Sequence, residues 1–272
     1  MRKMKSFAVA ALAALAVVGC SSNNKEVEQA SVNELYNKGS SALQEGSFTD
    51  SIRYLNAVTT RFPGSTYQEQ AMLDLIYANY KAQDYTATLM TIDSYLNQFP
   101  QSSNRDYAVY MAGLTNLATA DNAIQDFFGI DRSTRENTSL KTAFSNFQSL
   151  VRAFPQSPYS QDALARMAYI KDMLARHELD IAKFYYKRDA YVATANRVVG
   201  MLQLYPDAKA TYDALPLMRD SYEKMGLKTL AEQTQQVINA NQNKQFGEVK
   251  KPEEPSLIER VLPWFGGKKE QQ

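Results

Sequence analysis

The chain has 272 residues, with 30 lysines and arginines against 29 aspartates and glutamates, so its formal net charge at pH 7 is +1. Nucleic-acid binding relies on many cationic contacts to phosphate, so a chain this close to neutrality is not expected to bind nucleic acid. Glycine and proline are sparse, at 11 and 9 residues, and alternating β-branched runs between turn pairs are missing. This composition favours long helices over a β-sandwich or barrel.

The first 19 residues have the features of a secretory signal peptide. Arg2, Lys3 and Lys5 form a basic start, and an apolar run follows from Phe7 to Val18. That run is well short of the ~20 apolar residues that a membrane-spanning helix needs. Residues 1–19 are therefore predicted to be removed from the mature chain rather than to remain in a membrane.

The signal ends at residues 17–20, Val-Val-Gly-Cys, which resemble the lipobox of bacterial lipoproteins. The resemblance implies that the Cys20 thiol receives a diacylglyceryl group and that its freed amine is acylated. Cys20 is the only cysteine, so an intramolecular disulfide is impossible. The alternative is an ordinary signal with a chance cysteine. Ser21 stands where aspartate often favours retention at the inner membrane, which implies the periplasmic face of the outer membrane, with residues 20–30 as a lipidated linker.

A short phrase, aromatic-Pro followed two residues later by a small residue, closes four amphipathic stretches of the chain. The four copies are Arg61–Ser65, Gln98–Ser102, Ala153–Ser157 and Leu204–Ala208. Proline ends a helix and biases the residue before it away from helical backbone angles. The phrase therefore predicts the end of the second helix of a repeated helical hairpin.

Residues placed at fixed offsets before Pro63 and Pro100 match the tetratricopeptide pattern, and the two prolines are 37 residues apart. We expect an all-α solenoid of five tetratricopeptide-like repeats over residues 31–243, because a single repeat cannot bury its own apolar faces. Pro155 follows Pro100 by more than this 37-residue spacing, which predicts an insertion at 121–138 between the two helices of the third repeat. Pro206 follows Pro155 by more than this 37-residue spacing, and we expect the extra residues to belong to one long or kinked helix from about Ser160 to Lys187.

The lipobox, the five repeats and three short stretches together resemble the BamD family of outer-membrane assembly lipoproteins. The stretches are Asp74–Ala78, Asp126–Arg132 and Ala195–Val198, and the resemblance covers roughly residues 1–241. It implies that the C-terminal repeats bind the barrel-inserting protein BamA and that other Bam lipoproteins are partners. The complex would fold unfolded outer-membrane protein precursors into the membrane. Composition and periodicity alone predict only a lipid-anchored helical scaffold for protein binding.

Catalytic motifs are missing from the sequence. It has no G-x-S-x-G elbow, phosphate loop or H-E-x-x-H, and His177 is its only histidine. A zinc site or a Cys-His nucleophilic pair therefore cannot be assembled. We expect no enzyme activity, no metal and no cofactor apart from the lipid on Cys20. The alternative function is a tetratricopeptide lipoprotein that organises peptidoglycan or cell-envelope division enzymes.

The repeat register places four tyrosines on the inner wall of the N-terminal repeats: Tyr36, Tyr77, Tyr80 and Tyr110. Tyrosine combines an apolar ring with a polar tip, which suits peptide capture. The alternative is that the rings only fill helix–helix contacts. The family resemblance implies that the N-terminal repeats receive the C-terminal targeting segment of barrel precursors, which ends in an aromatic residue.

Three other residues are candidates for contact with partner proteins. Arg197 lies on the second helix of the fourth repeat, on a face away from Val198, and arginine is a preferred anchor for carboxylates. Phe127 and Phe128, in the insertion, either dock on the solenoid or meet a partner. Residues 244–272 are expected to be a disordered linker followed by a short amphipathic tail, which could dock on a partner, lie on a membrane or stay free.

If Cys20 carries the anchor, then Cys20→Ala should leave an unprocessed or soluble chain. Membrane fractionation and the mass of the mature chain measure this directly, with Ser21→Ala as the control that keeps the thiol. A Cys20→Ala chain that is still cleaved and bound to the outer membrane without its partners would refute lipid anchoring.

Overall fold

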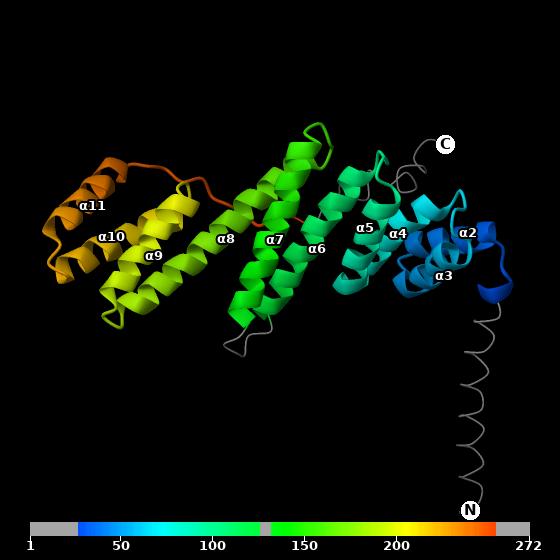
Figure 1. The fold of residues 1–272 in the computed structure, drawn as a ribbon, viewed down its shortest axis with the longest axis horizontal. Helices are drawn as coiled ribbons and strands as arrows, with labels where there is room; N and C mark the ends of the chain where they lie inside the picture. The colour runs from blue at the N-terminus through cyan, green and yellow to red at the C-terminus, as the bar shows by residue number, and fades with distance from the viewer. Residues whose placement is uncertain (1–26, 126–131, 254–272) are drawn as a thin grey trace, which may run out of the picture. The chain divides into compact units, whose positions relative to one another are not determined.

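The computed structural model describes residues 27–125 and 132–253, and every helix or strand within these ranges is an α-helix (Figure 1). The helices are α2 (Val32–Gln44), α3 (Phe48–Arg61), α4 (Gln68–Lys81), α5 (Tyr85–Gln98), α6 (Arg105–Gln125), α7 (Arg132–Ala153), α8 (Ser160–Tyr186), α9 (Tyr191–Leu204), α10 (Lys209–Lys224) and α11 (Lys228–Asn241). They follow one another as five consecutive pairs, which confirms the predicted all-α repeat fold. The chain divides into two compact units, one up to Thr115 and one from Asn116 onward.

Four of the pairs turn from the first helix to the second in the same way. In each turn, the residue two positions before the second helix has a positive φ. The residue after it donates its N–H to the carbonyl of the residue five positions earlier in the chain. The turn residues are Gly46 (φ 76°), Gln83 (φ 61°), Asp189 (φ 57°) and Gly226 (φ 75°). The bonds are Ser47 to Ala42 (2.8 Å), Asp84 to Asn79 (2.9 Å), Ala190 to Tyr185 (3.1 Å) and Leu227 to Tyr222 (2.9 Å). This is a Schellman-type helix end, in which a left-handed residue satisfies the final carbonyls.

The aromatic-Pro phrase forms a second repeated turn, between one pair and the next. Phe62, Phe99 and Tyr205 are the C-cap residues that directly follow α3, α5 and α9, with φ between −122° and −132°. The residue three positions on donates its N–H back to the aromatic carbonyl, as Ser65 does to Phe62 at 3.2 Å. The prediction that the phrase ends the second helix of a hairpin is confirmed at these positions.

The core of the first unit forms where α2, α3 and α4 meet. Leu35, Leu55 and Val58 are fully buried there, with Ala71 and Leu75 beside them. Gly39 allows α2 to approach α3 closely, because a Cβ at this position would lie 2.8 Å from the Leu55 side chain. Of these residues, Leu35, Gly39 and Leu55 stand at the repeat offsets before Pro63.

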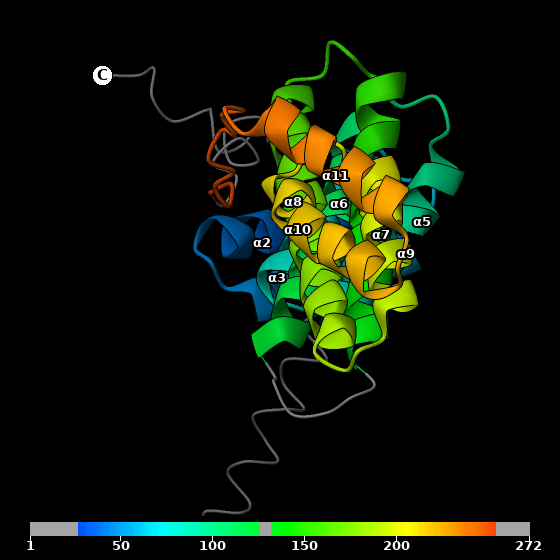
Figure 2. The same ribbon diagram turned by 90° about the vertical axis from the view of Figure 1, so that its left-hand side faces the viewer.

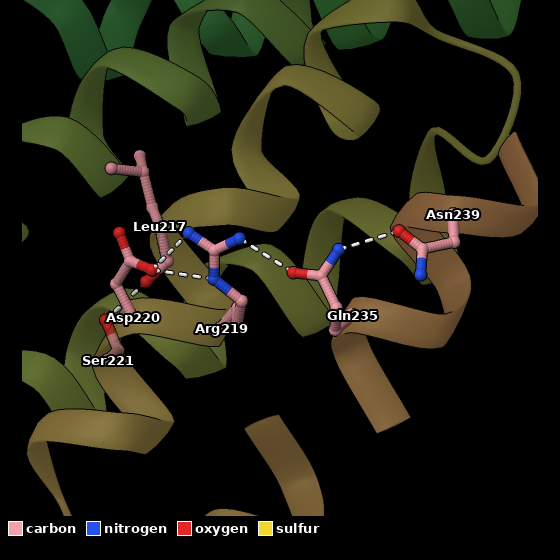
Figure 3. Close-up of polar contacts among 6 residues, drawn as sticks. All are labelled: Leu217, Arg219, Asp220, Ser221, Gln235 and Asn239. Atoms are coloured by element: carbon pink, nitrogen blue, oxygen red, sulfur yellow. Dashed lines mark hydrogen bonds and ion pairs between the residues drawn. The ribbon is translucent and has the colours of Figure 1, made fainter. Parts of the chain in front are cut away.

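The second unit is organised around α8, which packs against α7, α9 and α10. Its 27 residues, Ser160–Tyr186, form one continuous helix, as the sequence predicted. The last pair is joined by a polar network (Figure 3). On α10, Arg219 binds Asp220 at 2.6 Å and donates to Gln235 of α11 at 2.7 Å, and Gln235 donates to Asn239 at 2.8 Å.

The described part of the predicted insertion is helical. Residues 121–125 continue α6, and residues 132–138 begin α7. The extra length of the third pair therefore goes largely into longer helices, while the limits 121–138 remain a prediction. Phe127 and Phe128, the signal peptide, Cys20 and the tail from residue 254 lie outside the described residues.

The segment after α11, expected to be a disordered linker, is described as far as residue 253. This segment is not helical, but it packs back onto its own unit: the Phe246 ring lies 4.9 Å from the Tyr212 ring, and Arg166 donates to the Glu253 carbonyl at 2.8 Å. In Figure 2, where α10 and α11 lie foremost, the orange segment leaves α11 along one side of these helices.

The repeated turn makes a stability prediction. Gly46→Ala should lower the free energy of unfolding by about 1 kcal/mol because alanine resists positive φ, and no neighbouring atom lies within 4 Å to complicate the change. Gln83→Gly should raise it by a few tenths to about 1 kcal/mol for the same reason. Urea unfolding measures both.

Gly200→Ala is the control for this pair, because Gly200 lies inside α9 with the same open surroundings and should be stabilised by alanine. Equal signs for Gly46→Ala and Gly200→Ala would contradict a role for backbone strain at the turn.

Candidate functional site

Within residues 27–125 and 132–253, no group of three or more His, Cys, Asp or Glu side chains could hold a metal ion. None of the helices described there is long and apolar enough to cross a membrane. The candidates are therefore surfaces on which aromatic and charged side chains gather. We call them the Tyr36 site, in the first unit, and the Arg197 hollow, in the second.

The Tyr36 site is built from α2 and the start of α4. The half-buried Tyr36 ring stacks on Tyr67, with centroids 4.8 Å apart and planes at 28°. The Tyr67 hydroxyl donates to Asn33 on α2 at 3.0 Å, which fixes the pair. Two parallel rings held in this way offer a flat apolar surface with polar edges, suited to an aromatic side chain of a ligand.

Asp74 lies on α4 beside Tyr36 and is completely buried. Gln70 donates to its Oδ1 at 2.9 Å and Tyr36 is a further hydrogen-bonding neighbour, but Oδ2 has no partner of good geometry among the described residues. Burial raises the pKa of Asp74 to about 8, so the carboxyl is largely protonated at neutral pH. Burial, followed by the nearby Asp74 charge, also raises the pKa of Tyr36.

Sequence reasoning did not single out Asp74 as part of a site. The signal was present, because one carboxylate interrupts an otherwise apolar helix whose residues from Ala71 to Asn79 are all buried. A buried carboxyl without full hydrogen bonding is costly and is commonly found at functional positions.

Two of the four predicted groove tyrosines do not line an open surface. Tyr77 is 4% exposed and Tyr110 is fully buried, so both rings belong to the core. Their burial agrees with the alternative expectation, that such rings only fill helix–helix contacts. The register failed here because α4 is covered on every side and has no free stripe. Tyr80 is half-buried, and its ring lies 6.0 Å from the Tyr85 ring at the turn into α5.

The Arg197 hollow lies between α8 and α9 and has a volume of about 300 Å³. It is lined by Glu178 and Tyr185 from α8 and by Asn196, Arg197, Gly200 and Leu204 from α9. Arg197 donates from Nη1 to Glu178 Oε2 at 2.8 Å, and the two side chains are 36% and 23% exposed. Arg197 is thus accessible, as the sequence predicted, but its charge is already paired within the chain.

Apolar side chains are unusually exposed on the same two helices. Leu204 and Val192 on α9 are 64% and 63% exposed, and Phe184 on α8 is 49% exposed. The Arg188 guanidinium lies 3.6 Å from the Phe184 ring centroid, a cation–π contact. Of the three apolar residues, Leu204 lines the Arg197 hollow itself, and an exposed apolar group beside a charged hollow is typical of a protein-binding surface.

Tandem helical hairpins with two such surfaces define a tetratricopeptide-type scaffold. Comparisons with known proteins identify the family within this class of scaffold. The sequence model of the YfiO family, described as an outer membrane lipoprotein, matches residues 28–237. The chain belongs to this family of outer-membrane lipoproteins.

Three relatives are each named outer membrane protein assembly factor BamD. The protein of Haemophilus influenzae is 71% identical over 94% of this chain and 98% of its own length. That of Pasteurella multocida is 62% identical over the same two shares, 94% and 98%. That of Vibrio cholerae is 37% identical over 88% of this chain and 99% of its own length. The resemblance to the BamD family is confirmed.

Asp74 predicts a pH dependence of stability. Its pKa rises from an ordinary 3.8 to about 8 on folding, so between these values the unfolded chain has lost a proton that the folded chain keeps. Its contribution to stability is therefore complete below about pH 4 and falls as the pH rises toward 8. Asp74→Asn should remove this fall and gain on the wild type by a few kcal/mol at most near pH 8.

Urea unfolding of both chains between pH 4.5 and 8.5 tests this, with Asp93→Asn as an exposed control on α5. Parallel stability curves for the wild type and Asp74→Asn would show that Asp74 is not held protonated by the fold.

Proposed function

We propose that this chain is a lipid-anchored scaffold of outer-membrane protein assembly. It would hold the barrel-inserting protein on its C-terminal repeats and receive unfolded outer-membrane proteins on its N-terminal repeats. The observation that carries the proposal is the identity of 71% and 62%, over nearly complete lengths, to proteins named as outer membrane protein assembly factors. The membership in an outer-membrane lipoprotein family supports the location.

The anchor is the lipid on Cys20, which would hold the repeats at the periplasmic face of the outer membrane. The lipobox sequence at residues 17–20 supports this assignment. One diacyl group together with one N-acyl chain supplies more apolar surface than the two membrane signals that stable anchoring requires.

The Arg197 hollow is the proposed contact for the barrel-inserting partner. A guanidinium has five N–H donors, so Arg197 can donate hydrogen bonds to a partner carboxylate while it keeps its bond to Glu178. Glu178 has two effects: it orients Arg197 before binding, and it weakens the positive potential that a partner carboxylate experiences. The exposed Leu204 and Val192 would supply apolar contact around this charged centre.

The Tyr36 site is the proposed contact for the C-terminal segments of barrel precursors. Tyr36 and Tyr67 offer a stacked pair on which an aromatic end residue can pack, and Tyr80 with Tyr85 offers a second pair. Tyr77 and Tyr110 would not touch the ligand, since both are buried.

The proposal predicts separate losses at the two sites. Arg197→Met, which keeps the length of the side chain but removes its charge, should weaken binding of the purified periplasmic region of the barrel-inserting partner by about tenfold or more. It should leave binding of a peptide copied from a barrel protein's C-terminus unchanged. Tyr36→Ala should do the reverse, and isothermal titration of both ligands against both variants measures this.

Arg176→Met is the matched control, because Arg176 pairs with Asp172 on the same helix and lies outside the Arg197 hollow. Glu178→Gln should retain or strengthen binding of the partner, since it frees Arg197. Equal losses from Arg176→Met and Arg197→Met would refute the Arg197 contact. Recovery of peptidoglycan enzymes in place of a barrel protein, in a pull-down from solubilised outer membranes, would favour the alternative function.

A further inference from the structure

The C-terminal segment Lys244–Glu253 lies along α8 and α10, the first helices of the fourth and fifth pairs, which pack against each other (Figure 1). Most of its side chains are exposed, and only Phe246 and Pro252 are half-buried. A segment that is extended, polar and held by few side chains has the form of a peptide ligand on a helical repeat rather than that of a core element.

The first contact is aromatic. Phe246 packs on Tyr212 of α10 with ring centroids 4.9 Å apart. Lys244 donates from Nζ to the Tyr212 hydroxyl at 2.6 Å and lies 4.2 Å from the centre of the same ring. Tyr212 thus recognises both an aromatic ring and a neighbouring ammonium group.

The second contact is to the backbone. Arg166 of α8 donates from Nη2 to the Glu253 carbonyl at 2.8 Å. Arg166 as a whole is 5% exposed, and its guanidinium is fixed by Asp162, which accepts from Nε at 2.5 Å. A buried, oriented arginine that binds a main-chain carbonyl recognises an extended chain and not a particular side chain.

Between these two contacts the segment does not fill the surface beneath it. Two hollows of about 400 and 520 Å³ remain between residues 246–249 and the helices. Asp172 on α8 and Lys209 on α10 line both hollows. Val249, which also lines both, is still 39% exposed. Imperfect packing of this kind costs the segment dispersion energy and makes it replaceable.

We propose that the α8–α10 face is a peptide-binding surface of its own and that residues 244–253 are its tethered occupant. The ligand that displaces them is an extended polypeptide segment of a partner protein that carries an aromatic residue two positions after a lysine. This inference goes beyond the proposed function, which places precursor segments at the Tyr36 site and the barrel-inserting partner at the Arg197 hollow.

The covalent connection of residues 244–253 to α11 determines how easily another peptide can bind the α8–α10 face. The occupant follows α11 directly, so its effective local concentration is on the order of millimolar. A free segment of equal intrinsic affinity therefore competes poorly against the intact chain and binds well once the occupant is weakened or removed. The face is open only to partners that bind more tightly than the chain's own segment.

Fluorescence anisotropy of a labelled peptide copied from residues 243–253 tests the proposal. It should bind the full chain carrying Phe246→Ala at least about tenfold more tightly than the wild-type full chain. It should also bind a chain ending at Asn243, which retains α11, but not a chain ending at Glu253, which keeps the occupant. Far-ultraviolet circular dichroism confirms that each chain retains its helices.

Peptide variants separate recognition from general stickiness without altering the protein. A peptide with Phe246→Ala should bind the chain ending at Asn243 about tenfold more weakly or worse, whereas Gln245→Ala, at an exposed position, should bind as the parent does. Equal affinity of the parent peptide for all four chains, no binding to the chain ending at Asn243, or equal losses from the two peptide variants would each overturn the proposal. These outcomes are independent of the Arg197 and Tyr36 titrations.

Discussion

The chain reverses direction inside four of its helical pairs through a single residue with positive φ, and the other structural features of the repeats depend on this constraint. A left-handed residue directs the backbone out of the first helix while its neighbour's N–H satisfies a carbonyl five positions back. The second helix then begins within two residues and must pack against the first. Because Gly46 and Gln83 are 37 residues apart, as are Asp189 and Gly226, the same geometry returns at the same point of each pair. The packing of neighbouring pairs follows from this repetition.

Two arginines at the proposed binding surfaces are each paired with a carboxylate of the same chain. Arg197 is paired with Glu178, and Arg166 is held by Asp162 before it binds a carbonyl. Compensation of this kind lowers the attraction for any one partner but orients each arginine in advance, so less conformational entropy is lost on binding. Asp74 differs, since it is buried with one oxygen unpaired and with a pKa raised to about 8.

Much of the fold could be predicted from the sequence because its signals are local. The aromatic-Pro phrase ends helices by backbone sterics, which act between neighbouring residues. The sites were less accessible, because they depend on contacts between distant residues. The register could not show that Tyr77 lies on a helix buried on all sides, nor that Glu178 pairs with Arg197 from 19 residues away. Residues 244–253 look like a linker by composition, which carries no information on the contact between Phe246 and Tyr212.

The two repeated turns also explain how this architecture tolerates growth. In the third pair the surplus residues lengthen α6 and α7 to 21 and 22 residues, and in the fourth they lengthen α8 to 27. Along α8 the additional length stays packed, because Leu174, Ala175, Leu179 and Ala182 are all buried. Helix length therefore differs from pair to pair, whereas the turns inside the first, second, fourth and fifth pairs keep one backbone geometry.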